Sequence, residues 1–160
     1  KWLRAKTEPE KSIARKHFDA AIDTMLLYTQ THGTLFTPNW MDMEFVTPLL
    51  VARKQFDMGT ARFYGYWEDG NLVTLSPCNP DVLASIYAHD DKLWLVVGNW
   101  TDTEQTVNAK LNLAKISPHL NAATAIIKNI WKDGTVTHDG DNYHFSVPPK
   151  SARIIEIGNQ

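Results

Sequence analysis

The sequence predicts a mainly β protein: an antiparallel β-sandwich of about eight strands, preceded by an N-terminal helical segment. Before about residue 60 the apolar residues recur at the spacing of one helix face. After it they alternate along short runs that are separated by turn residues such as Gly, Asp and Asn, which favours strands. We therefore expect a helical segment over residues 1–60 and an antiparallel β-sandwich domain over residues 61–160.

The first helix is expected over about residues 8–32. Thr7 and Glu10 have the spacing of a capping box, and Pro9 suits the first turn of a helix. Gly33 suits the position just after the helix ends. Between these signals one apolar stripe runs at helical spacing; it consists of Phe18, Ala21, Ile22, Met25, Leu26 and Thr29. Such a long helix with one apolar face needs a surface to pack against.

A second, shorter helix is expected from Thr47 to about Asp57, with Thr47 as its cap and Pro48 at its first helical position. Just before it, Asp42 and Glu44 could act as paired carboxylates of a small complete enzyme. Residues two apart share a face in an extended chain but diverge in a helix, and no other chemical group converges on them. A pair of solvated charges is the simpler interpretation.

The strands are expected in the second part of the chain, where turn signals recur every 8–12 residues. They span residues 61–67, 71–76, 82–89, 92–99, 105–113, 122–130, 142–148 and 151–158, with a weaker strand at 135–138. Hairpin turns are expected at residues 68–71, 90–91, 132–134 and 139–141. Residues 93–97 are apolar on both faces, which predicts a central strand.

Composition excludes several classes of partner. The chain is 43% hydrophobic and 21% charged, as is ordinary for a globular protein, and its net charge is −2. Residues 61–160 carry 8 basic and 11 acidic side chains, so the expected sandwich has no basic field for a nucleic acid. No apolar run approaches the roughly 18–20 residues of a membrane span. The single cysteine, Cys78, lies in an expected turn and cannot form an internal disulfide.

Aromatic residues are the strongest candidates for a binding site. Flat rings stack on the apolar C–H faces of sugars, and Trp and Tyr add a polar group for hydrogen bonding. The candidate carbohydrate-binding residues are Tyr64, Tyr66, Trp67, Trp100 and Trp131. The alternative is that these rings fill a core or a domain interface, where large aromatics usually lie.

The sequence indicates no metal, no cofactor and no catalytic residue. Asp133, Asp139 and Asp141 match a calcium loop poorly and lack its bidentate Glu, so turns explain them better. His138 and His144 flank a turn and could face each other across a hairpin, but two His do not complete a zinc site. Neither a nucleophile elbow nor a phosphate-binding loop occurs.

Four segments in order resemble one known family. They are FYGYWEDG at 63–70, VLASIY at 82–87, LWLVVGNWT at 93–101 and VPPKSARIIEI at 147–157. This series is similar to the end of large bacterial glycoside hydrolases of the family 123-like group. There a YW-containing segment leads out of a (β/α)₈ barrel, and the following strands build a C-terminal β-sandwich. Where that group often has Asn after the YW pair, this chain has Glu68-Asp69-Gly70-Asn71, whose turn chemistry is equivalent but which puts any side-chain role of that Asn in doubt.

The resemblance implies a function that the residues alone do not. It implies that residues 1–60 are the last helical part of the barrel, or a linker packed on it. It also implies that the catalytic carboxylates lie on barrel strands outside this sequence. The location that it suggests is periplasmic or extracellular.

The expected function is therefore that of a non-catalytic C-terminal accessory domain of a glycoside hydrolase, which supports the catalytic barrel and contacts carbohydrate. One alternative is an independent carbohydrate-binding module that uses Tyr64, Tyr66 and Trp67. Another is a protein–protein interaction sandwich, attached through the helix stripe of Phe18, Ile22 and Met25. The expected partners are the barrel and carbohydrate; neither nucleic acid nor a membrane is expected.

Overall fold

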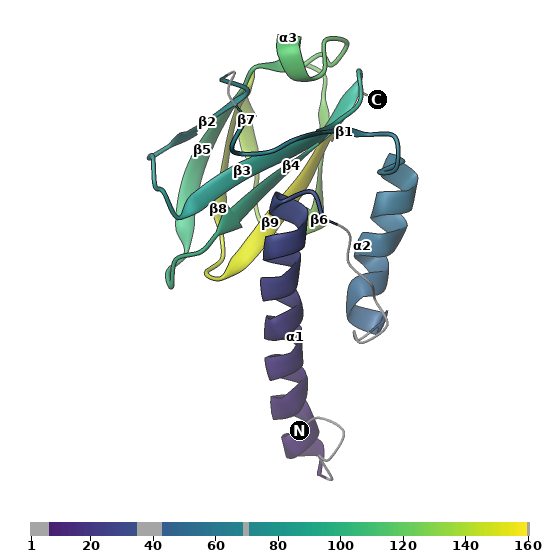
Figure 1. The fold of residues 1–160 in the computed structure, drawn as a ribbon, viewed down its shortest axis with the longest axis vertical. Helices are drawn as coiled ribbons and strands as arrows, with labels where there is room; N and C mark the ends of the chain where they lie inside the picture. The colour runs from purple at the N-terminus through teal and green to yellow at the C-terminus, as the bar shows by residue number, and fades with distance from the viewer. Residues whose placement is uncertain (1–6, 35–42, 69–70, 160) are drawn as a thin grey trace.

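A computed structural model describes residues 7–34, 43–68 and 71–159. It has three layers, which are a four-stranded sheet, a five-stranded sheet and two helices (Figure 1). The helices lie against the outer face of the five-stranded sheet, whose inner face packs on the four-stranded sheet. This arrangement confirms the predicted antiparallel sandwich with an N-terminal helical segment.

Two helices precede the sheets, and a third, of one turn, lies between strands. They are α1 (Glu8–Thr31), α2 (Met43–Phe56) and α3 (Leu113–Ile116). The capping box is confirmed, because the Thr7 hydroxyl accepts from the Glu10 amide at 3.4 Å and the Glu10 carboxylate from the Thr7 amide at 3.1 Å. Gly33 follows the helix with φ 67°, as the C′ position requires.

The predicted start of α2 is wrong. This helix is already formed at Met43, so Pro48 lies inside it rather than at its first position. The Thr47 hydroxyl donates to the Met43 carbonyl at 2.5 Å and does not cap the helix. Pro48 has no amide to donate to the carbonyl four residues earlier, so the helix includes it with one backbone hydrogen bond fewer.

Nine strands are present in the described part of the chain. They are β1 (Arg62–Tyr64), β2 (Val73–Ser76), β3 (Val82–Ala88), β4 (Lys92–Asn99), β5 (Gln105–Leu111), β6 (Ile126–Trp131), β7 (Thr137–Asp139), β8 (Asn142–Val147) and β9 (Ser151–Gly158). The larger sheet has the order β1-β3-β4-β9-β6, and the smaller has β2-β5-β8-β7; every pairing is antiparallel. Residues 93–97 lie in the central strand β4, as predicted.

Two expected hairpins instead connect different sheets. β1 pairs with β3 and β2 with β5, so the segment after Tyr64 crosses from one sheet to the other. The segment 132–134 likewise leads from β6 to β7. The first strand also ends at Tyr64 rather than at residue 67, because the Glu68 amide bonds the Gly65 carbonyl at 2.9 Å and closes a turn there. By contrast, the turns after β3 and β7 connect paired neighbours.

The two faces of the larger sheet are buried in separate cores. In β4, Leu93, Leu95 and Val97 face the smaller sheet, whereas Trp94 and Val96 face the helices. The helix side of this second core includes Ile22, Leu26 and Leu27 of α1 with Val46, Leu49 and Phe56 of α2.

The predicted helix stripe thus has its partner within the chain. Ile22 is 4% exposed, and Phe18 and Met25 pack against the same core. The interaction sandwich that was expected to attach through this stripe therefore lacks its predicted surface. Among the described residues, no helix has the length and apolar character that a membrane crossing requires.

Candidate functional site

The five aromatic candidates do not share one environment. Trp131 is 7% exposed and lies in the helix-side core, with its Nε1 donating to Asp23 Oδ1 at 3.2 Å. Its ring meets that of Phe45 edge-on at 5.1 Å, so Trp131 has no free face for a sugar. Tyr64 is half-buried on β1 and packs against the core between the sheets. The burial of Trp131 leaves it no surface for carbohydrate, and Tyr64 is only partly open to solvent.

The other three candidates meet at one place on the surface. Tyr66 and Trp67 follow β1, Trp100 follows β4, and all three rings contact His32 at the end of α1. Tyr28, one turn earlier in α1, contacts both His32 and Trp100. We call these five residues the aromatic cluster. Trp67 is 55% exposed, Tyr28 53% and Tyr66 39%, so the cluster presents open ring surface to solvent.

Several neighbouring rings of the cluster are nearly perpendicular to one another. Tyr66 and Trp67 are in contact at 4.9 Å between centroids and 84° between planes. Tyr28 and Trp100 meet at 6.0 Å and 81°. The His32 ring is nearly perpendicular to Tyr66 and Trp100, at 90° and 87°, and within 29° of Trp67. Edge-to-face contacts of this kind are favourable because the positive ring edge meets the negative ring face.

Hydrogen bonds fix the imidazole at the centre of the cluster. His32 Nδ1 lies 2.8 Å from the Tyr28 carbonyl oxygen, which can only accept, so Nδ1 carries the proton. His32 Nε2 lies 3.2 Å from the Tyr66 hydroxyl, which donates to it when the ring is neutral. The two bonds hold the Tyr66 ring and the end of α1 together.

Three glycines provide the space in which the rings lie. A Cβ on Gly65 would lie 2.5 Å from the Trp67 indole, and one on Gly98 would lie 2.6 Å from the Trp100 indole. A Cβ on Gly33 would lie 2.7 Å from Phe63, which in turn contacts Trp67. These distances are shorter than any side-chain contact allows, so the rings rest directly on backbone. The cluster is therefore preformed.

Strand β3 holds the end of α1 in place. The buried Ser85 hydroxyl donates to the Thr31 carbonyl at 2.7 Å and accepts from the Tyr66 amide at 3.1 Å. The Tyr87 hydroxyl donates to the Gln30 carbonyl at 3.0 Å. These two carbonyls belong to the last turn of α1, where no further helical amide follows. Burial raises the pKa of Tyr87 to about 12, which keeps its hydroxyl protonated as a donor.

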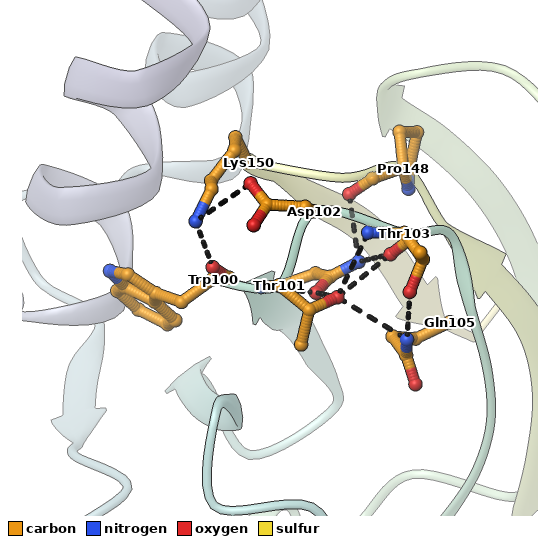
Figure 2. A network of polar contacts seen from close by, with 8 residues as sticks. Trp100, Thr101, Asp102, Thr103, Gln105, Pro148 and Lys150 are labelled. Atoms are coloured by element: carbon orange, nitrogen blue, oxygen red, sulfur yellow. Dashed lines mark hydrogen bonds and ion pairs between the residues drawn. The ribbon is translucent and has the colours of Figure 1, made fainter.

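A polar network fixes the backbone of Trp100 (Figure 2). The fully buried Asn99 donates through Nδ2 to the carbonyls of Thr103 and Val147, at 2.9 and 3.0 Å. Its Oδ1 accepts from the amide and the hydroxyl of Thr101, at 2.9 and 2.7 Å. Lys150 Nζ then donates to the Trp100 carbonyl at 2.6 Å. Both sides of Trp100 are thus tied to the sandwich.

A groove of about 170 Å³ lies beside the cluster. It is lined by Tyr64, Gly65, Tyr66, Glu68, Asn71, Leu72, Val73, Ala84 and Ile86, and Tyr66 therefore belongs both to the groove and to the cluster. Glu68 Oε1 accepts from the Gly65 amide at 2.8 Å, which orients the carboxylate at the groove. The groove thus brings carboxylate, amide and phenol groups next to open aromatic surface.

The other chemical candidates do not come together. Glu44 pairs with Arg15 at 2.8 Å, and Asp42 lies outside the described residues. The register pairs His138 with Tyr143 and His144 with Thr137, so the two imidazoles lie on opposite faces of the sheet and the predicted facing pair is wrong. Within the described ranges, no three metal-binding side chains gather in one place. Cys78 is exposed and is not in a disulfide.

Tyr28 and His32 are members that sequence reasoning missed. They are four residues apart and continue one edge of the predicted apolar stripe, since Tyr28 follows Met25 by three residues and His32 follows Thr29 by three. Their spacing could have added them to the stripe but not to a site, because the cluster is completed by the turn after β1 and the end of β4. The Asn99-Trp100-Thr101 sequence did carry a signal, since Asn followed two residues later by Thr favours a local turn.

Comparison with protein families gives a match over most of the chain. Residues 47–157 match the family model described as "Glycoside hydrolase 123, C-terminal domain". No curated protein matches the chain.

Solved structures resemble the chain at low sequence identity. An α-amylase from Geobacillus thermoleovorans, solved with acarbose, aligns at a TM-score of 0.55 and 13% identity, over 95% of this chain and 36% of that one. An Anoxybacillus α-amylase aligns at 0.49 and 14%, over 79% and 25% of the two chains. A maltogenic α-amylase from Thermotoga neapolitana aligns at 0.48 and 14%, over 79% and 28%. The chain thus spans between a quarter and just over a third of these structures.

Proposed function

We propose that this chain, which belongs to the family of glycoside hydrolase 123 C-terminal domains, is a non-catalytic accessory domain that supports a catalytic barrel and contacts carbohydrate. The carbohydrate contact is assigned to the aromatic cluster of Tyr28, His32, Tyr66, Trp67 and Trp100. Residues 1–60 then serve as the last helical part of the barrel, or as a linker packed on it.

The observation that carries the carbohydrate contact is the exposure of rings that could have been buried. Trp67 and Tyr28 each leave more than half of their surface open, although a large aromatic gains free energy from burial. Their positions are nevertheless fixed by glycine backbone and hydrogen bonds. Fixed, open rings beside polar groups are the usual composition of a sugar-binding surface.

The helical layer supports the proposed contact with a catalytic barrel. The first turns of α1 extend beyond the sandwich, and Ile13 there is 59% exposed (Figure 1). Met43 and Val51 of α2 are each 48% exposed. The match to the Geobacillus α-amylase covers all but a twentieth of this chain, so it includes most of α1 and α2 together with the sheets. The barrel contact is assigned to the helical layer, which carries these exposed apolar side chains.

Calorimetric titration of this chain against a panel of soluble polysaccharides tests the carbohydrate contact. We expect saturable binding that Trp67→Ala weakens by about tenfold, as the loss of one ring contact of roughly 1.4 kcal/mol implies. Ile126→Ala is the matched control, because Ile126 is 39% exposed but lies on β6, at the opposite edge of the sheet from β1. No binding at millimolar ligand would show that the domain does not contact carbohydrate.

A further inference from the structure

We infer that the aromatic cluster and the groove beside it bind a single soluble carbohydrate chain or chain end of at least two sugar units, and not the flat surface of a crystalline polysaccharide. This inference deepens the proposed function and rests on it. It follows from the angles between the rings, from their fixed positions and from the place of Tyr66.

The perpendicular pairs argue against a flat binding surface, although Tyr28 and Trp67 each lie within 29° of the plane of His32. A crystalline polysaccharide presents a plane, and it is matched by rings that lie side by side in one plane. Here Tyr66 and Trp67 meet at 84°, and Tyr28 and Trp100 meet at 81°. A plane that lies flush on the Trp67 indole meets the Tyr66 ring edge-on. The perpendicular rings of Tyr66 and Trp67 thus form a corner. One sugar unit can stack on one ring of this corner and touch the other ring with its edge.

The cluster is also compact. Each of its other four rings has its centroid within 6.3 Å of that of His32. A footprint of this size suits a chain end or a short stretch of chain, whereas a crystalline surface would need contacts spread along several units.

The corner is rigid before the ligand arrives. Gly65 and Gly98 allow the Trp67 and Trp100 indoles to rest on backbone, and the Tyr66 hydroxyl is bonded to His32 Nε2. The rings therefore cannot turn into one plane without breaking these contacts. Binding in the observed geometry avoids that cost, and preorganisation of this kind raises affinity for the ligand that fits.

The groove extends the site beyond one sugar unit. Tyr66 lines both the cluster and the groove of about 170 Å³, so a ligand that contacts Tyr66 in the corner continues into the groove. There Glu68 and Asn71 offer a carboxylate and an amide, which bind sugar hydroxyls. The ring corner thus holds one unit, and the groove binds its neighbour by hydrogen bonds.

Two binding measurements on this chain test the inference. One is calorimetric titration with soluble cello-, chito- and malto-oligosaccharides of one, two and four units; the other is retention on microcrystalline cellulose and on crystalline chitin. We expect binding of at least one soluble series, tighter for two units than for one, and no retention on either solid.

Variants separate the two parts of the site. Trp67→Ala is expected to weaken binding of every member of the bound series by about tenfold. Glu68→Gln keeps an oxygen for the Gly65 amide but removes the charge, and we expect it to weaken binding of two units more than binding of one. Ile126→Ala is again the control and should change neither.

The outcomes distinguish this inference from the proposed function. Retention on a crystalline solid that exceeds binding of the soluble series would overturn the inference and leave carbohydrate contact standing. Equal affinity for one and two units, with no effect of Glu68→Gln, would overturn the role of the groove. Binding of neither soluble nor solid carbohydrate would overturn the proposed carbohydrate contact itself.

Discussion

Ser85 shows how much of the site depends on one small side chain. Ser85 is 1% exposed, and its hydroxyl connects the end of α1, through the Thr31 carbonyl, to the backbone of Tyr66. Asn99 has the same role on the other side of the cluster, where it holds the backbone on both sides of Trp100. The exposed rings are therefore positioned by buried polar residues that are themselves closed to solvent.

Ser85→Ala is expected to lower the free energy of unfolding by about 1–3 kcal/mol, because it leaves the buried Thr31 carbonyl and the partly buried Tyr66 amide without their partner. Urea unfolding followed by fluorescence measures this change. Ser12→Ala, at an exposed position of α1, is the matched control and should change stability by less than about 0.5 kcal/mol. A Ser85→Ala variant as stable as this control would show that water replaces the hydroxyl.

At the scale of elements, α1 and β4 approach each other where β4 has no side chain. A Cβ on Gly98 would lie 2.7 Å from Leu27 and 2.8 Å from Thr31, both on α1, as well as 2.6 Å from the Trp100 ring. The close approach lets the helix end reach the hydroxyls of Ser85 and Tyr87 on the neighbouring strand. Gly98 thus sets the distance between the helical layer and the sheet.

Gly98→Ala is expected to destabilise the protein by about 1–3 kcal/mol, since an added methyl group in a packed site forces neighbouring groups apart. Gly59→Ala is a close control: nothing lies within 4 Å of the Cβ it would add, and its φ is not positive. Comparison of the two melting curves measures the difference. Equal melting temperatures would mean that α1 shifts on the sheet at no cost.

At the scale of the whole molecule, each of the two cores contains a buried tyrosine. Tyr87 lies in the core under the helices and Tyr143 in the core between the sheets. Burial raises the pKa of each to about 12. The environments differ, because Tyr87 donates to the Gln30 carbonyl, whereas the Tyr143 hydroxyl has no hydrogen-bond partner among the described residues.

These raised pKa values predict loss of stability at high pH. In the unfolded chain a tyrosine ionises near pH 10, but in the folded protein these two stay protonated up to about pH 12. The folded state thus binds more protons over this range, so the free energy of unfolding falls as pH rises from about 10 to about 12. The fall due to Tyr87 alone is on the order of 2–3 kcal/mol. Unfolding curves across this pH range measure it.

Two Phe variants test whether Tyr87 and Tyr143 cause this loss of stability. Each substitution should make the fall in the free energy of unfolding at alkaline pH shallower. At neutral pH, Tyr87→Phe is expected to cost about 1 kcal/mol through the lost hydrogen bond, whereas Tyr143→Phe should cost nothing or stabilise. Tyr28→Phe, at an exposed position, is the control. If the free energy of unfolding falls equally at alkaline pH in both core variants and in the unchanged protein, groups other than Tyr87 and Tyr143 cause the fall.

Much of the fold could be predicted from the sequence because its signals are local. The capping box of Thr7 and Glu10, the positive φ at Gly33 and the two-sided apolar strand at 93–97 each depend on residues close together in the chain. Errors arose where a local signal was ambiguous. Pro48 fits the start of a helix but also lies inside one, and an Asp-Gly pair such as Asp133-Gly134 fits a hairpin but also lies on a connection between the two sheets.

The candidate site was predictable only in part. Tyr66, Trp67 and Trp100 were recognised as aromatic candidates, but nothing in their spacing distinguished them from Trp131, which is buried. Their contact with His32 joins α1, the turn after β1 and the end of β4. Such contacts depend on which element covers which face, and this is set by packing across the whole chain.

The sequence by itself determined the mainly β class, the N-terminal helices and the position of most strands along the chain, because hydrophobic periodicity and turn residues act within a few residues of one another. Tertiary structure alone decided that the helix stripe packs on the five-stranded sheet, that Trp131 is buried and that five rings meet at the end of α1. The physical reason is that periodicity shows which face of an element is apolar but not what covers it. What covers each face depends on contacts between segments far apart in the chain.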